Sequence, residues 1–180
     1  MNNKTMVKDL TQGNVAKLLI AFTLPLFLSN SLQAAYNIVD MVIVGQFIGG
    51  PGISAVSIGG DILHLITFIA IGFASAGQVI IARKVGEGKI DELSHIIGTM
   101  FSFLLLCALG LSIICFIFRN AILTALNTPY ESYEYAMDYM VTCIFGLVFI
   151  YGYNIVSAIL RGMGDGKRHF VFVAIAAILN

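Results

Sequence analysis

Long apolar stretches alternate with short polar segments along the whole chain. Four of these stretches reach the roughly 20 residues that an α-helix needs to cross a bilayer, and a fifth, shorter one runs to the last residue. Their bounds are 18–48, 53–82, 96–118, 140–160 and 170–180. The pattern predicts an all-α fold, a polytopic bundle of membrane helices that follows a polar segment at residues 1–17.

A polar stripe lies within the first apolar stretch and ends in the stretch's only charge, Asp40. The stripe consists of Asn30, Gln33, Asn37 and Asp40, at spacings of three, four and three, with Tyr36 and Ser29 on its border. Such spacings place side chains on one face of a helix. A charge at bilayer depth costs at least a few kcal/mol, so Asp40 marks a site that handles an ion, a proton or a substrate. We therefore expect the stripe to face a cavity or other helices.

The second apolar stretch carries a polar face of its own. Its members are Ser57, Asp61, His64, Ser75 and Gln78. Residues 49–52 predict a tight turn between the first two stretches, which places Asp40 and Asp61 at the same depth, about 13 Å from the turn. Either the two acids share a proton or bracket a cation, which requires their stripes to converge, or Asp61 faces water. We expect His64 to hydrogen-bond Asp61, since no other His or Cys stands at metal-ligand spacing.

The end of the fourth stretch is also polar. Asn154, Ser157 and Arg161 share one face there. Tyr151 either lines an aromatic pocket for a flat cationic ligand or packs in the interior. The glycines at 162–166 do not form a phosphate-binding loop, because Arg161 stands at its first glycine position and Arg168 at its Ser or Thr position. We expect no enzyme, no metal site and no nucleic-acid partner.

Composition and charge support a membrane protein and give it an orientation. The chain is 58% apolar and 11% charged with a mean hydropathy of +0.91, whereas soluble domains carry about 25% charged residues. All Lys and Arg residues except Arg119 lie before the first stretch, between the second and third, or between the fourth and fifth. The positive-inside rule makes that side, and hence the N-terminus, cytoplasmic. The three cysteines lie inside apolar stretches and predict no disulfide framework.

Short patterns rich in Gly, Pro, Asn and Asp punctuate these stretches. They are Leu24-Pro25-Leu26, Asn37-Ile38-Val39-Asp40, Val44-Gly45, Gly86-Glu87-Gly88-Lys89, Asn127-Thr128-Pro129, Ala136-Met137-Asp138-Tyr139 and Arg161-Gly162-Met163-Gly164-Asp165. Their order and spacing over the whole chain resemble the amino-terminal part of the MATE (multidrug and toxic compound extrusion) transporters.

The resemblance implies a transporter of twelve helices in two lobes, with about four and a half helices of the N-terminal lobe in this chain. It implies export of organic cations across a plasma membrane, bacterial in this case, in exchange for protons or sodium and with no other cofactor. Asp40 matches the family's first-helix carboxylate for cation coupling, with Gln33 and Asn37 as polar neighbours, and Asn180 resembles a fifth-helix asparagine of the same site. The expected partners are organic cations, the bilayer and the C-terminal lobe.

Several polar residues lie outside that family pattern. Asp61, His64, Gln78, Tyr36 and Asn154 are candidates for an additional polar cavity. Two other functions stay open. A lipid-linked oligosaccharide flippase of the same superfamily needs a large basic cavity, whereas the embedded charges here are acids. Since the fifth stretch ends after eleven residues, we expect a fragment, or a truncated, non-transporting membrane protein that needs a partner.

Overall fold

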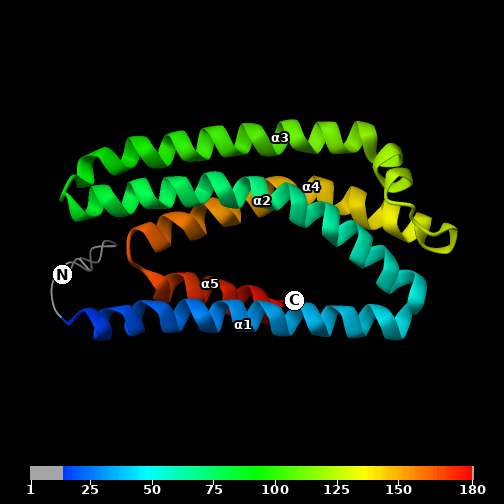
Figure 1. Ribbon diagram of the computed structural model, residues 1–180, viewed down its shortest axis with the longest axis horizontal. Coiled ribbons are helices and arrows are strands. Elements are labelled where there is room, and N and C mark those ends of the chain that lie inside the picture. The colour runs from blue at the N-terminus through cyan, green and yellow to red at the C-terminus, as the bar shows by residue number, and fades with distance from the viewer. Residues whose placement is uncertain (1–13, 180) are drawn as a thin grey trace. The chain divides into compact units, whose positions relative to one another are not determined.

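The computed structural model describes residues 14–179, and helices make up nearly all of this range (Figure 1). The elements are α1 Val15–Phe47, α2 Gly50–Gly86, the short 3₁₀ helix η1 Ile90–Glu92, α3 Leu93–Ala125, α4 Tyr130–Gly162 and α5 Gly166–Leu179. The helices α1, α2, α3 (with η1) and α4 are each long and apolar enough to cross a membrane. The predicted all-α membrane fold is confirmed.

The helices generally extend beyond the apolar stretches that predict them. α4 already begins at Tyr130, although the apolar stretch begins at residue 140. At the other end of α1, Ile48 lies in a turn rather than in the predicted span. The predicted fifth span lies in α5 except for Asn180, and Asn180 and residues 1–13 of the N-terminal segment lie outside the described residues. Hydropathy locates the buried middle of a helix and misses polar turns at its ends.

The connection between α1 and α2 is shorter than the predicted turn at 49–52, because α2 already begins at Gly50. Gly49 adopts a φ of 77°, which glycine reaches without steric cost. Its N–H donates to Gly45 O at 3.1 Å and its carbonyl accepts from Ile53 N at 3.2 Å, so it bonds to both helices. Pro51 lies in the first turn of α2, where its missing N–H costs nothing.

The segment between α2 and α3 carries a network of ion pairs. Arg83 Nε lies 2.9 Å from Glu87 Oε1, Lys89 Nζ lies 3.2 Å from Glu87 Oε2, and Lys84 Nζ lies 2.6 Å from Glu92 Oε2. The hydrogen bonds from Arg83 and then Lys89 lower the pKa of the Glu87 carboxyl. The first residues of this segment, Arg83–Gly86, still belong to α2 and form its last turn.

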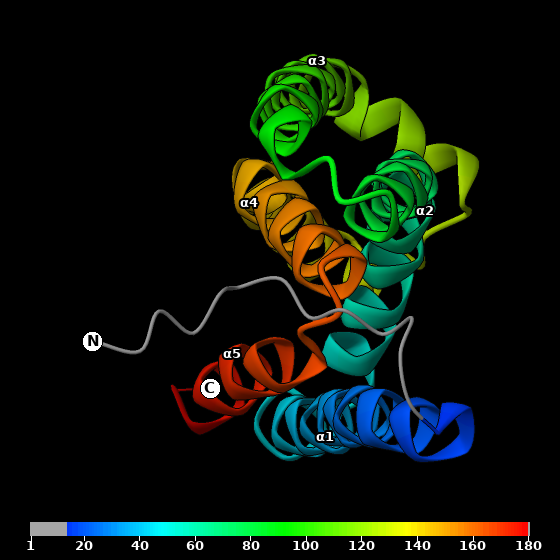
Figure 2. The ribbon, with the colours of Figure 1, turned by 90° about the vertical axis from the view of Figure 1, so that its left-hand side faces the viewer.

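The helical residues form two compact units, and most long helices contribute to both. The described part of unit 1 combines residues 14–37, 73–101 and 155–179. Glycines let its helices approach closely. A Cβ at Gly77 would lie 2.3 Å from Met100 Sδ, and a Cβ at Gly162 would lie 2.9 Å from Gln78 O, so neither position has room for a side chain. The start of α5 packs on α1 in the same way, with Gly166 close to Phe22 O (Figures 1 and 2).

Unit 2 combines residues 38–72 and 102–154. Its fully buried side chains include Leu104, Leu123, Met140, Leu147 and Tyr151. The hydroxyl of Tyr151 donates to Ile66 O at 2.9 Å, which links α4 to α2. Of the two readings of Tyr151, the structure therefore supports interior packing, since its side chain is 0% exposed and its polar atom is bonded.

Candidate functional site

The polar stripe of α1 follows the helix as predicted, with its members at different levels of exposure. Asp40 is half-buried and belongs to unit 2. Gln33 and Tyr36 are half-buried and Asn37 is exposed, and these three belong to unit 1. Along described α1, Ser29 at the stripe's border is the buried residue, and its hydroxyl donates to Pro25 O at 2.8 Å.

Tyr139 on α4 packs against α2 within unit 2, because a Cβ at Gly59 would lie 3.0 Å from its Cε1. Its side chain is half-buried, and Cys143 follows one turn further along α4. Asp40, Tyr139 and Cys143 all belong to unit 2. The Asp40 carboxylate itself offers two oxygens, which suit a proton or a small hard cation.

The sequence reasoning missed Tyr139 for an identifiable reason. Tyr139 stands one residue before the predicted apolar stretch, whereas α4 already begins at Tyr130. Tyr139 and Cys143 stand four residues apart and thus share a helix face. Nothing in the sequence, however, indicates that Tyr139 packs against Gly59 of α2.

The acid and histidine of α2 behave differently from Asp40. Both Asp61 and His64 are exposed in unit 2. Within the described residues, no hydrogen bond or ion pair joins these two side chains, so the expected pairing is absent from this structure. A site shared by Asp40 and Asp61 stays a prediction.

The remaining predicted residues are spread over the chain. Gln78 is half-buried in unit 1, and Asn154 is half-buried in unit 2, where its amide donates to Ile150 O at 2.9 Å within its own helix. Asn180 lies outside the described residues. Among residues 14–179 there is no group of three His, Cys, Asp or Glu side chains that could hold a metal ion. Cys107, Cys115 and Cys143 are free thiols in the described part of the chain.

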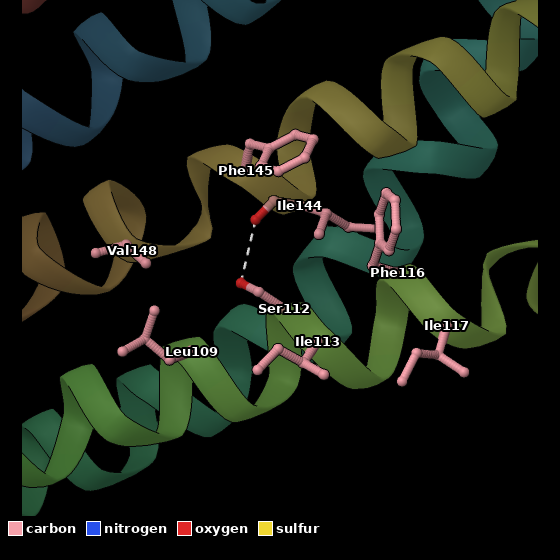
Figure 3. A pocket seen from close by; sticks show the side chains of 8 residues that line it. All are labelled: Leu109, Ser112, Ile113, Phe116, Ile117, Ile144, Phe145 and Val148. Carbon is pink, nitrogen blue, oxygen red and sulfur yellow. Dashed lines mark hydrogen bonds between the residues drawn. The ribbon is translucent and has the colours of Figure 1, made fainter.

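A separate apolar pocket of about 320 Å³ lies between α3 and α4 in unit 2 (Figure 3). Its lining residues are Leu109, Ser112, Ile113, Phe116, Ile117, Ile144, Phe145 and Val148. The one hydroxyl among them, that of Ser112, donates to Ile144 O at 3.1 Å and is therefore already satisfied (Figure 3). No acid lines this pocket, so it offers an organic cation no counter-charge.

Comparison with known proteins adds a family match. The MatE family model matches residues 25–180. The probable multidrug resistance proteins YpnP and YoeA of Bacillus subtilis (strain 168) are each 29% identical to the chain, over 172 and 159 residues. These alignments cover 96% and 88% of this chain but only 39% and 34% of the relatives. The chain therefore spans less than half the length of these relatives.

Solved structures share the fold. A MOP superfamily transporter from Pyrococcus furiosus, described as having a binding pocket of reverse polarity that suggests a different function, matches with a TM-score of 0.89 at 21% identity. That match covers 99% of this chain and 39% of the other. An outward-facing multidrug resistance MATE family transporter of the same superfamily matches with a TM-score of 0.87 at 22% identity, over 93% of this chain and 37% of that one.

Proposed function

Because the chain belongs to the MatE family, we propose that it forms the N-terminal part of a cation-coupled multidrug efflux antiporter. The chain is a multi-pass membrane protein, with four helices able to cross a bilayer. The transported substrates are organic cations and the coupling ion is a proton or sodium. Relatives named multidrug resistance proteins support this proposal.

One observation carries the coupling mechanism: Asp40 is a half-buried carboxylate on a membrane-length helix. A carboxylate at bilayer depth costs at least a few kcal/mol, so it marks a functional site by default. In the proposed cycle, Asp40 takes up the coupling cation from one side of the membrane and releases it on the other as the lobes alternate their access. Gln33 and Asn37 contribute polar groups on the same face of α1, Asn180 supplies a further amide to the proposed site, and the C-terminal lobe completes the path.

The distribution of basic residues supports an orientation with the N-terminus in the cytoplasm of a bacterial cell. Arg83 and Lys84 lie in the last turn of α2, and Arg161 lies in the last turn of α4. Lys167 and Arg168 follow at the start of α5. The connections at the opposite helix ends lack Lys and Arg, and Arg119 lies near that end within α3. These basic ends therefore face the cytoplasm of the proposed transporter.

The proposal is tested by replacing Asp40 in the full-length transporter. Asp40→Asn keeps the size and polarity of the side chain but removes its titratable charge. We expect it to abolish gradient-driven efflux of a cationic dye such as ethidium from proteoliposomes, with normal expression. Glu134→Gln, which alters an exposed acid in the polar first turns of α4, is the matched control and keeps wild-type efflux. If the Asp40→Asn transporter exports the dye as fast as the wild type, Asp40 has no coupling role.

The two alternatives predict different outcomes in the same preparation. A lipid-linked oligosaccharide flippase would bind an anionic lipid-linked substrate and would not move the dye. It is less well supported, because the acids Asp40 and Asp61 are the only charged residues between positions 18 and 82. A non-transporting, partner-dependent protein would co-purify with a second polytopic subunit and show no efflux alone.

A further inference from the structure

The apolar pocket between α3 and α4 lies on two helices that are each long and apolar enough to cross a bilayer. Its α3 side is a single helix face, because the lining residues there follow helical spacing: Leu109, Ser112, Ile113, Phe116 and Ile117. Exposed side chains make up most of the lining, namely Leu109, Ile113, Phe116, Ile117 and Phe145. The pocket is therefore an open apolar recess on membrane-length helices (Figure 3).

A single cation, Arg119, stands beside this pocket. Its Cζ lies 4.6 Å from the ring centroid of Phe116, which lines the pocket, and its Nη1 donates to Phe116 O at 2.8 Å. A guanidinium has five N–H donors, and the bond to Phe116 O uses one of them. Among residues 14–179, Arg119 forms no ion pair with a carboxylate. The half-buried side chain thus keeps donors for an anion at the edge of the pocket.

The position of Arg119 along α3 suits the phosphate of a lipid. From Arg119 to the end of α3 at Ala125 is about 9 Å of helix. An arginine this close to the end of a membrane helix reaches the polar interface with its long side chain. The pocket lies on the other side of Arg119, from Ile117 back to Leu109. The order along α3 is therefore that of a phospholipid, with the charged group near the membrane surface and the apolar chain toward the bilayer centre.

The pocket and the cation contribute differently to binding. Lipid tails are as apolar as the lining side chains, so the pocket alone gains little when one chain replaces another. Its concave shape does favour a flexible chain that fills it, because an empty recess loses dispersion contacts. Selectivity comes from the guanidinium of Arg119, whose planar set of donors matches the oxygens of a phosphate.

One acid, Asp138, opposes an anion at this place. It is exposed and precedes Ile144 on α4, at the same end of the pocket as Arg119, because α3 and α4 run in opposite directions (Figure 1). In the described part of the chain it forms no ion pair with Arg119. Removing its charge is therefore expected to strengthen the binding of an anion, whereas removing the charge of Arg119 weakens it.

We propose that Arg119 and the pocket between α3 and α4 together bind one anionic phospholipid. An acyl chain lies in the pocket, and the phosphate lies on the guanidinium. This site is separate from the coupling site at Asp40, and lipid binding to it does not depend on transport.

The test is native mass spectrometry of the full-length transporter in detergent, titrated with phosphatidylglycerol or with phosphatidylcholine of the same acyl chains. We expect one phosphatidylglycerol to bind at lower concentration than phosphatidylcholine does. Arg119→Gln weakens this binding about fivefold, the effect of one basic residue on an anionic lipid near a membrane surface, and leaves phosphatidylcholine binding unchanged. Asp138→Asn strengthens the binding of phosphatidylglycerol.

Two tryptophan variants separate the pocket from packing in general. Ile113 and Ile114 are both exposed on α3, but Ile113 lines the pocket and Ile114 does not. Ile113→Trp fills the recess and weakens phosphatidylglycerol binding although Arg119 is intact. Ile114→Trp adds the same side chain on a different face and keeps wild-type binding.

Several outcomes would overturn the inference. Equal phosphatidylglycerol affinity in the wild type and Arg119→Gln removes the phosphate contact, and equal wild-type affinity for the two lipids does the same. Equal losses in Ile113→Trp and Ile114→Trp remove the pocket from the site. If the wild type retains no lipid and Ile113→Trp instead disrupts its folding or a dimer, a protein segment occupies the pocket. None of these results alters the efflux expected of Asp40→Asn, so the antiporter proposal is decided separately.

Discussion

Removing the Tyr151 hydroxyl tests the interior of unit 2 directly. Tyr151 is 0% exposed, and its hydroxyl donates to Ile66 O at 2.9 Å. A hydrogen bond contributes about 0.5–1.5 kcal/mol net in proteins, and those between membrane helices average about 0.6 kcal/mol. The Ile66 carbonyl also accepts a helical N–H within α2, so Tyr151→Phe leaves no buried acceptor unbonded. We therefore expect Tyr151→Phe to lower the free energy of unfolding by about 0.5–1 kcal/mol.

The assay is unfolding of the full-length transporter in mixed micelles by increasing mole fractions of SDS. Tyr151→Ala also removes the ring and leaves a cavity, so its expected cost is about 3–5 kcal/mol. Tyr130→Phe is the control, because Tyr130 is 95% exposed and its change should not alter unfolding. The reasoning is refuted if Tyr151→Phe costs as much as Tyr151→Ala, which would mean that the hydroxyl rather than the ring holds this region together.

Two further predictions concern packing and pH. Gly162→Ala places a Cβ 2.9 Å from the backbone oxygen of Gln78. Because the backbone cannot move far, the same assay should show a free energy of unfolding lowered by about 1–3 kcal/mol. Gly146→Ala, whose Cβ would meet nothing within 4 Å, is the control, and equal effects of the two substitutions would contradict the packing argument. In the segment after α2, the pKa of Glu87 is lowered from its ordinary value of 4.5. The ion pairs of Glu87 therefore stabilise the folded segment fully at pH values above 4.5, and this stabilisation is lost as the pH falls through the lowered pKa. A spin label at Asp91→Cys should accordingly become more mobile as the pH falls through the lowered pKa of Glu87. The change should be smaller in Glu87→Gln, and an identical acid response in both proteins would count against this account.

Hydropathy predicts the helices well because bilayer thickness fixes the length of each apolar stretch. It fails where a helix continues into polar sequence, as at Tyr130 in α4 and Arg83 in α2. The same limitation hid Tyr139, which lies just before the predicted fourth span. Asp40 could be identified, since an isolated charge in an apolar stretch is visible from sequence alone.

The partners of these residues could not be predicted, because they depend on how helices pack. Tyr151 had two readings until the structure placed its hydroxyl on Ile66 O. The expected pairing of Asp61 with His64 followed from helical spacing, yet both side chains are exposed and the structure does not pair them. The spacing of residues along a helix predicts which side chains share a face, but it does not determine whether their rotamers bring them into contact.

The short connection at Gly49 has a mechanical consequence. Gly49 donates to Gly45 O and accepts from Ile53 N, so the hydrogen bonds of the last turn of α1 and the first turn of α2 meet at one residue. A Cβ at Gly52 would also lie 2.7 Å from Ile48 Cβ, so the two chain segments touch there. Such a junction allows little independent movement of the two helix ends. A tilt of the unit 2 part of α2 therefore also moves the segment of α1 that carries Asp40.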